Sequence, residues 1–132
     1  MVVLDTDFMI GLLRENKSAS EFMEKLERDG HSICTTTINA FELFEGALLS
    51  SKSKDKDTSE VEGFLKSIGS LNFNEPASWK AAEISSDLMK KGEPLDFQDI
   101  AIASIAMVNG EPIVTRNVKH FSRIKGLKIE KW

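Results

Sequence analysis

The stretch VVLDTDFM, residues 2–9, decides the first element of the fold. Its apolar, β-branched start predicts a buried first strand, and two carboxylates, Asp5 and Asp7, follow it directly. A charge that leaves water costs several kcal/mol unless a partner compensates it. Asp is also a favoured helix N-cap, and for Asp7 we favour that role. The stretch therefore predicts either an ordinary strand-to-helix turn or the first part of a site.

Length and composition indicate one domain covering residues 1–132. No apolar run approaches the roughly 18 residues of a membrane span, and no secretory leader precedes the first strand, so we expect a cytoplasmic protein. Cys34 is the single cysteine and cannot form an internal disulfide, which predicts a core position. The two histidines, His31 and His120, lack zinc-site spacing, and no structural zinc is expected.

Charge is distributed unevenly along the chain. The formal net charge of −4 argues against a protein that coats nucleic acid by bulk electrostatics. Residues 116–132 nevertheless carry six Lys or Arg and one acid, a net charge of +5, which leaves −9 for residues 1–115. This basic segment is a candidate phosphate-contact surface. Solvated charges on the last short elements explain it equally well.

Short apolar runs alternate with segments of helical periodicity, which predicts an α/β fold with a parallel sheet covered on both faces. Residues 18–30 begin with a capping-box pattern at Ser18 and Glu21, and Pro76 and Gly92 bracket a later helix. The polar residues 50–60 predict a loop or a frayed helix end. We expect strands at 2–5, 31–37, 71–73, 112–115 and 126–132, and helices at 8–15, 18–30, 38–50, 61–69, 76–92 and 96–110.

Polar residues recur where the predicted strands end, and ligands of open parallel sheets bind at these carboxyl ends. Asp5 ends the first strand, and Glu42 lies one turn into the helix after the second. Glu42 shares a helical face with apolar or small residues, which is unusual for a solvent-facing Glu. The other members of the set are Asp96 and Asp99, at the start of the 96–110 helix, and Thr115 and Asn117, after the 112–115 strand.

Several carboxylates without Cys or His at the same strand ends are typical of a site for Mg²⁺ or Mn²⁺. Without a cation they would repel one another. Nucleases commonly hold two such ions about 3.5–4 Å apart. Each residue also has a purely structural interpretation: Asp5 and Asn117 as turn residues, Asp96 and Asp99 as an N-cap and first-turn acid, and Glu42 as a surface residue. Because these residues are all placed at strand ends, the metal-site hypothesis has the same weight as the structural interpretations.

Three stretches resemble the PIN-domain family, and within it the VapC-type toxin ribonucleases. Residues 2–14, VVLDTDFMIGLLR, are similar to the first motif of the family, and residues 36–47, TTINAFELFEGA, to the second. Residues 92–132, from GEPLDFQDIA to the closing GLKIEKW, resemble the closing block nearly end to end and are the most specific match. The resemblance implies metal-binding acids at Asp5, Glu42 and Asp99.

The resemblance also implies a Rossmann-like three-layer α/β/α sandwich with a mainly parallel sheet and metal-dependent cleavage of RNA. It further implies frequent homodimers and neutralisation by a VapB-type antitoxin encoded beside the toxin. One position departs from the pattern, because Asn117 stands where many PIN domains carry a fourth acid. Asn117 brings no charge, so a second metal ion is in question, and Asp96 could supply the missing negative charge.

The resulting hypothesis gives each residue a role. Asp5, Glu42 and Asp99 hold Mg²⁺ or Mn²⁺, which activates a water to attack the phosphorus, and Asp96 is a further ligand or a helix cap. Thr115 and Asn117 orient the water or a phosphate oxygen. Apolar helical segments at 8–13 and 41–50 form either a groove for an antitoxin helix or ordinary core. The candidates for contacts with the RNA backbone are Arg116, Lys119 and Arg123.

Two other functions compete with this hypothesis. The Asp-x-Asp after an apolar strand is also found in haloacid-dehalogenase-type phosphatases, where Asp5 would be the nucleophile and Asp7 the general acid. Met9 and the absence of a later Gly-Asp-x-x-x-Asp motif argue against it. The other possibility is a PIN-like scaffold that binds RNA or a partner without cutting. Replacement of Asp7 separates the enzymes, because only the phosphatase needs it.

Overall fold

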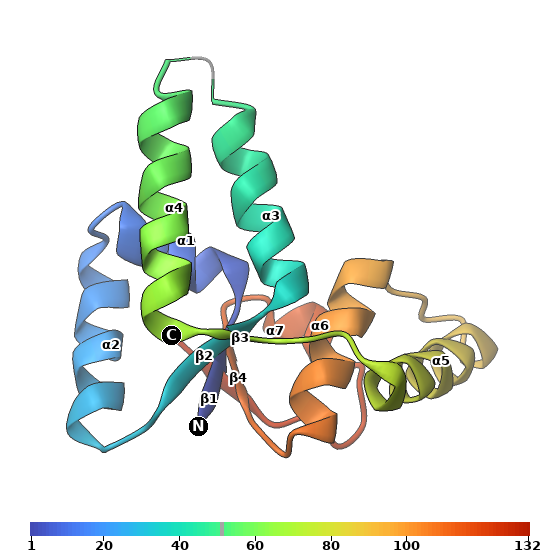
Figure 1. Ribbon diagram of the computed structural model, residues 1–132. Coiled ribbons are helices and arrows are strands. Elements are labelled where there is room, and N and C mark those ends of the chain that lie inside the picture. Colours follow the sequence, from blue (N-terminus) through green and yellow to red (C-terminus); the bar gives the residue numbers. More distant parts are fainter. Residues whose placement is uncertain (51) are drawn as a thin grey trace.

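The computed structural model describes residues 1–50 and 52–132 and shows a parallel sheet between two sets of helices (Figure 1). In this described part of the chain the strand order is β3-β2-β1-β4-β5, and every neighbouring pair is parallel. The predicted three-layer α/β fold is confirmed. The strands are β1 (Val2–Leu4), β2 (Ile33–Thr36), β3 (Ser70–Leu71), β4 (Ile113–Thr115) and β5 (Ile129–Lys131).

Helices connect successive strands, as parallel pairing requires. Helices α3 and α4 stand side by side and project beyond the sheet, whereas α5 lies against α6 on the other side of the molecule (Figure 1). The helices are α1 (Thr6–Leu13), α2 (Lys17–Arg28), α3 (Thr37–Leu48), α4 (Lys54–Ile68), α5 (Glu75–Lys90), α6 (Phe97–Val108) and α7 (Val118–Phe121).

Both faces of the sheet are buried. Val2 and Leu4 of β1 pack into a core that includes residues of α1, α2, α3 and α4. Val3 points to the opposite face, where it packs with Cys34 and with Ala106 of α6. The predicted core position of Cys34 is thus confirmed, and burial raises the pKa of its thiol to about 11. Within the described residues, no helix combines the length and the apolar character needed to cross a bilayer.

Helix α1 begins two residues earlier than the sequence predicts. Asp5 is its N-cap and accepts a hydrogen bond from the main-chain N–H of Thr6 at 2.9 Å. The predicted N-cap role of Asp7 is wrong, because this residue lies inside the first turn. Its carboxylate accepts instead from the main-chain N–H of Arg116 at 3.0 Å and from the indole of Trp132 at 3.4 Å. Asp7 therefore joins α1 to the end of the chain.

Two other predictions about helices are corrected. Helix α2 starts at Lys17 with Asn16 as its N-cap, so the capping box at Ser18 is not formed. Helix α4 begins at Lys54 and runs through most of the predicted loop 50–60, of which Ser51 lies outside the described residues. Exposed pairs such as Lys56–Glu60, spaced i,i+4, support a polar helical surface before apolar packing begins at Val61.

The closing block contains one element that the sequence did not predict. Helix α7 is a four-residue turn after β4, too short to show a helical period. The last strand is shorter than expected, because Leu127 precedes β5. Pro76 lies in the first turn of α5, as the sequence predicts, and Asn74, which was not predicted as a cap, is the N-cap of this helix. These elements bring the ends of β1 and β4 and the starts of α3 and α6 to one edge of the sheet.

Candidate active site at the carboxyl edge of the sheet

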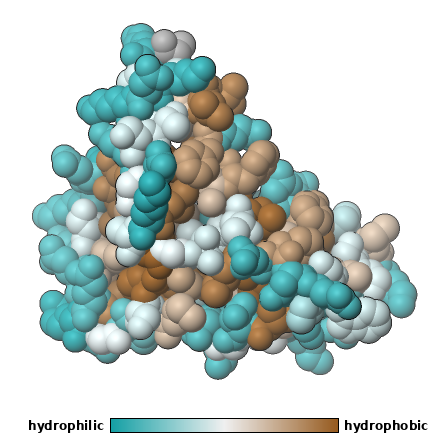
Figure 2. Space-filling model, viewed as in Figure 1, coloured by the Kyte–Doolittle hydropathy of each residue, from teal (hydrophilic) through white to brown (hydrophobic). Residues whose placement is uncertain are grey.

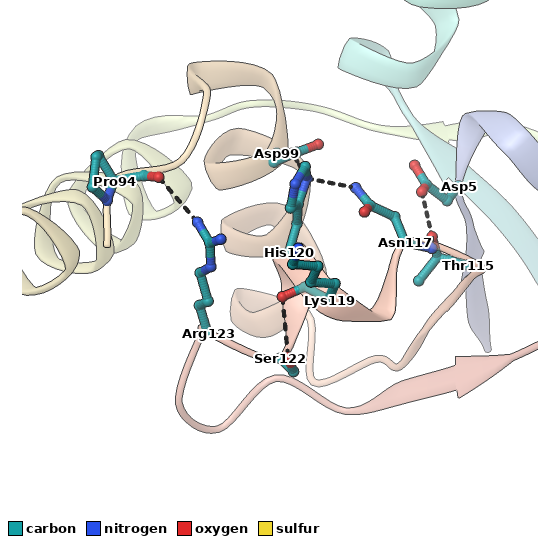
Figure 3. A network of polar contacts seen from close by, with 9 residues as sticks. All are labelled: Asp5, Pro94, Asp99, Thr115, Asn117, Lys119, His120, Ser122 and Arg123. Carbon is teal, nitrogen blue, oxygen red and sulfur yellow. Dashed lines mark hydrogen bonds and ion pairs between the residues drawn. The ribbon is translucent and has the colours of Figure 1, made fainter. Parts of the chain in front are cut away.

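Asp5 lies at the centre of this edge and is only 7% exposed. One carboxylate oxygen accepts from the N–H of Thr6 at 2.9 Å and from the side-chain amide of Asn39 at 3.1 Å. The other accepts from the hydroxyl of Thr115 at 2.6 Å (Figure 3). Burial raises the pKa of Asp5 to about 7, against the lowering effect of the Thr115 hydrogen bond, and the charge of Asp7 raises it further.

Thr115 ties the end of β4 to the end of β1. Its hydroxyl is fully buried, donates to Asp5 and accepts from the main-chain N–H of Asn117 at 2.9 Å. The hydroxyl proton is thus committed to Asp5, so the side chain positions a carboxylate. The predicted contact of Thr115 with water or phosphate remains a prediction.

Glu42 enters the site from the first turns of α3. The hydroxyl of Thr6 donates to its carboxylate at 2.7 Å and accepts from the amide of Asn39 at 2.9 Å. Asn39 is fully buried, and its amide donates to both Asp5 and Thr6, so it connects Asp5 to Glu42 only through the Thr6 hydroxyl. Partial burial raises the pKa of Glu42, the Thr6 hydrogen bond lowers it, and the charge of Asp99 raises it again. The charge of Asp99 therefore acts on Glu42 at this edge of the sheet.

Asp99 reaches the same edge from the first turn of α6. Burial raises the pKa of its carboxyl, a charge on His120 lowers it, and the charge of Asp96 raises it. The Nδ1 atom of His120 lies 3.5 Å from the carboxylate of Asp99 and 3.1 Å from the side-chain nitrogen of Asn117 (Figure 3). Asp96 occupies the predicted N-cap position of α6, but its side chain makes no capping hydrogen bond.

The structure brings Asp5, Glu42 and Asp99 to one region from three different elements. Burial raises the pKa of all three, and the charge of Glu42 further raises that of Asp5, as that of Asp99 does for Glu42. A bound cation would offset both the cost of burying these carboxylates and the repulsion between their charges. Among the described residues, however, no three Asp, Glu, His or Cys side chains stand close enough to hold one ion directly. Mg²⁺ typically keeps several waters and uses one or two carboxylates, a donor set that these residues fit.

The predicted RNA-contacting residues occupy three different environments. The guanidinium of Arg116 stacks on Trp132, 3.6 Å from the ring centroid, and donates to the main-chain oxygen of that residue at 3.3 Å. Arg123 donates to the main-chain oxygen of Pro94 at 3.3 Å, while Lys119 is exposed (Figure 3). The RNA contacts of all three residues remain predictions.

Three residues of the site were not identified from the sequence: Thr6, Asn39 and His120. The position of Asn39 could have been noticed in the sequence, because it follows a potential N-cap, Thr36, by three positions. Its main-chain N–H donates to the Thr36 hydroxyl at 3.1 Å. Thr6 lies between Asp5 and Asp7 in the sequence. His120 was considered only as a zinc ligand, and nothing in its spacing indicates that it contacts Asp99.

Fold and site together define a doubly wound α/β protein with a buried acidic centre at the carboxyl edge of its parallel sheet. The chain belongs to the PIN-domain family, whose model matches residues 2–127. The predicted family resemblance is thereby confirmed, and the matched region contains all the carboxylates of the site.

Individual relatives cover nearly the whole chain. The tRNA(fMet)-specific endonuclease VapC of Shigella flexneri is 31% identical over 98% of this chain and 96% of its own length. Ribonuclease VapC2 of Rickettsia felis is 29% identical, with the same coverage. Among solved structures, VapBC2 of Rickettsia felis bound to a DNA fragment from its promoter matches with a TM-score of 0.90 and 28% identity, over 100% of this chain and 99% of the other.

Proposed function

We propose that this protein is an endoribonuclease and the toxin of a toxin–antitoxin pair, and that its cleavage depends on Mg²⁺ or Mn²⁺. The observation that carries the proposal is the group of carboxylates, Asp5, Glu42 and Asp99, all with raised pKa values at the carboxyl edge of the sheet. Curated relatives named as VapC ribonucleases or endonucleases support the reaction class.

In the proposed mechanism the carboxylates bind the ion, and uncharged residues orient the carboxylates. Asp5, Glu42 and Asp99 would hold Mg²⁺ or Mn²⁺. When bound, the ion lowers the pKa of a coordinated water and offsets charge on the phosphodiester. Thr115 and Asn39 hold both oxygens of Asp5, while Thr6 holds Glu42. These buried hydrogen bonds fix the carboxylates before substrate arrives, which reduces the reorganisation needed in the reaction.

Transfer RNA is the substrate class that we propose first. Two relatives, from Shigella flexneri and Salmonella typhimurium, are named as tRNA(fMet)-specific endonucleases and are 31% and 29% identical to this chain. The basic segment 116–132 borders the site and would contact the phosphate backbone, which positions RNA without reading its sequence. Arg116 and Lys119 are the exposed candidates among the three residues.

An antitoxin is the partner that we propose, because solved relatives are VapBC complexes. A hollow of about 240 Å³ lies between α1, α3 and α4, in the region where the sequence suggested a groove. Apolar side chains such as Ile10, Leu13 and Val61 line it, and Glu42 connects it to the acidic site. The carboxylates of Asp57 and Glu60 also border it. A partner helix with apolar residues and a basic side chain would complement this lining.

Dimerisation, which the resemblance implies, stays a prediction. Apolar side chains gather along the projecting α3 and beside it (Figure 2). Phe41, Leu48 and Leu49 are each more than half exposed. If these side chains form an interface between two copies, then Leu48→Glu will convert a dimer to a monomer in light-scattering measurements. An unchanged mass would place the interface elsewhere.

The decisive experiment is cleavage of initiator tRNA by purified, antitoxin-free protein. The matched variants are Glu42→Gln and Glu45→Gln, since Glu45 is an exposed acid on the same helix. We expect discrete products with Mn²⁺ or Mg²⁺, none with EDTA, and a loss of about a hundredfold or more in Glu42→Gln alone. Elongator methionine tRNA, tested in parallel, measures selectivity.

Other outcomes would favour the competing functions. Cleavage in EDTA, or full activity of Glu42→Gln, would contradict the proposed chemistry. Intact RNA in every reaction, with bound metal confirmed, would favour the non-catalytic scaffold. Hydrolysis of p-nitrophenyl phosphate that depends on Asp7 would favour the phosphatase. The structure gives little support to that last role, because both oxygens of Asp7 already accept from Arg116 and Trp132.

A further inference from the structure

A stacked pair of side chains, Arg116 on Trp132, flanks the acidic site. Arg116 follows Thr115 directly in the chain, and the hydroxyl of Thr115 donates to Asp5 at 2.6 Å (Figure 3). Because neighbouring Cα atoms are about 3.8 Å apart, Arg116 begins one residue away from the group that touches Asp5. The indole of Trp132 packs against the core that includes α1, so the pair lies on the α1 side of the site.

Contacts with α1 fix the orientation of the indole of Trp132. The ring of Phe8 lies 5.1 Å from it, measured between centroids. Gly11 allows a close approach, since a Cβ atom at this position would lie 3.1 Å from the indole ring. The carboxylate of Asp7 accepts from the indole N–H at 3.4 Å. The ring therefore presents a constant surface to Arg116.

The guanidinium of Arg116 lies over a face of this indole. Its central carbon is 3.6 Å from the ring centroid, and its Nε–H donates to the main-chain oxygen of Trp132 at 3.3 Å. The main-chain N–H of Arg116 donates to Asp7 at 3.0 Å, so both ends of this residue are held. Arg116 is nevertheless exposed. Among residues 1–50 and 52–132, its two terminal nitrogens have no hydrogen-bond or ion-pair partner.

A planar cation with one face on an indole and the other open to solvent suits a nucleobase. Proteins that bind single-stranded RNA stack unpaired bases on aromatic rings and on guanidinium planes. A phosphate contact needs only a positive charge, which a mobile side chain supplies equally well. The side chain of Arg116 is ordered before RNA arrives, and this order reduces the entropic cost of forming a stack.

We propose that the open face of the Arg116 guanidinium stacks on a nucleobase of the bound RNA, in a nucleotide that flanks the cleaved phosphodiester on the α1 side of the site. This inference rests on the proposed function, because it takes RNA as the ligand. It replaces the phosphate contact expected for Arg116 with a base contact. Stacking accepts every base, so the contact positions the strand without selecting a sequence.

The salt dependence of RNA binding separates a stacked base from a phosphate contact. Initiator tRNA is titrated with the Glu42→Gln protein, which should not cut it, and fluorescence anisotropy is recorded at several salt concentrations. Arg116→Lys, added to this protein, keeps the charge and removes the plane. We expect its affinity to fall by about fivefold or more, with an unchanged dependence on salt. Arg28→Lys, at the exposed end of α2, is the matched control and should change neither quantity.

Nuclear magnetic resonance supplies a second readout with Arg116 unchanged. The Nε–H signal of Arg116 in ¹⁵N-labelled Glu42→Gln protein is assigned by its absence from the spectrum of Arg116→Lys. A base stacked over the guanidinium shields this proton by its ring current, so the signal should move upfield when tRNA is added. A hydrogen bond to phosphate would move it downfield.

The outcomes distinguish this inference from the proposed function. Equal affinity with and without Arg116→Lys, or a signal that stays in place or moves downfield, would overturn the stacking role and leave the nuclease proposal intact. Lower stability of Arg116→Lys in urea without an upfield shift would assign the stack to folding alone. An upfield shift in a protein that cuts no RNA would support the inference and contradict the nuclease. If tRNA does not bind at all, then both the inference and the choice of tRNA as substrate are wrong.

Discussion

Replacement of Asp5 by Asn should stabilise the metal-free protein at alkaline pH. The carboxyl group has an ordinary pKa of 3.8 and a folded-state pKa of about 7, raised chiefly by burial. The folded state therefore binds this proton more tightly than the unfolded state. The resulting stabilisation is fully present below pH 3.8, declines as the pH rises from 3.8 to about 7, and is absent above that range.

The size of the stability change follows from the difference between the two pKa values of Asp5, 3.8 and about 7. At about 1.36 kcal/mol per pH unit, ionised Asp5 costs the folded protein about 4 kcal/mol at pH 8. Asn39, Thr6 and Thr115 donate to the carboxylate, and an amide in its place can accept fewer of these bonds, at a cost of about 1 kcal/mol. Asp5→Asn should thus gain about 3 kcal/mol at pH 8 and almost nothing at pH 5, where the unmodified protein has recovered most of the loss.

Urea unfolding in EDTA at pH 5 and pH 8 measures the difference. Asp87→Asn, at an exposed position of α5, is the control and should change stability by less than about 0.5 kcal/mol at both pH values. Mn²⁺ should stabilise the unmodified protein at pH 8 and have little effect on Asp5→Asn. If Asp5→Asn is less stable than the unmodified protein at pH 8, or if its effect is the same at both pH values, then Asp5 is not destabilised by burial and the reasoning fails.

Three further substitutions test the scaffold of the site. Asn39→Ala removes both amide donors from the Asp5 and Thr6 network and should cost about 2–4 kcal/mol in urea unfolding, with a parallel loss of RNA cleavage. Trp132→Ala removes the packing against Phe8 and the stacking partner of Arg116, and should lower stability by about 2–3 kcal/mol, whereas Trp79→Ala, 73% exposed, should change it by less than 1 kcal/mol. Thr115→Val keeps the shape of the buried side chain but removes the hydroxyl that donates to Asp5 at 2.6 Å. Titration calorimetry should then show weaker metal binding. An unchanged metal affinity would mean that the hydroxyl contributes only to folding.

The parallel sheet made much of the site predictable. Carboxyl ends of neighbouring parallel strands meet at one edge, so residues that follow different strands were expected to be close. Asp5 and Thr115 lie 110 positions apart in the chain and are hydrogen-bonded. The helix that carries Asp99 was recognisable because its small apolar residues suit burial on several sides, and Ala101 and Ala103 are fully buried.

The polar contacts within the site were beyond sequence reasoning. The Asn39 amide joins Asp5 and Thr6 across more than 30 positions, and only a close three-dimensional fit decides which oxygen it reaches. The role of Asp7 failed for the same reason, because its indole partner lies 125 positions away. The first half of helix α4 was missed because residues 54–60 carry almost no apolar periodicity, and this part of the helix is supported instead by charge pairs and by later packing.

The most direct test of the central claim is a comparison of metal binding with cleavage in the same protein. Mn²⁺ is titrated into the unmodified protein and into Asp99→Asn by calorimetry, and tRNA cleavage is followed over the same range of free Mn²⁺. The account predicts that cleavage rises with site occupancy and that Asp99→Asn loses both. Cleavage that is complete before any metal binds, or that survives in Asp99→Asn without bound metal, would show that these carboxylates are not a metal-dependent nuclease site.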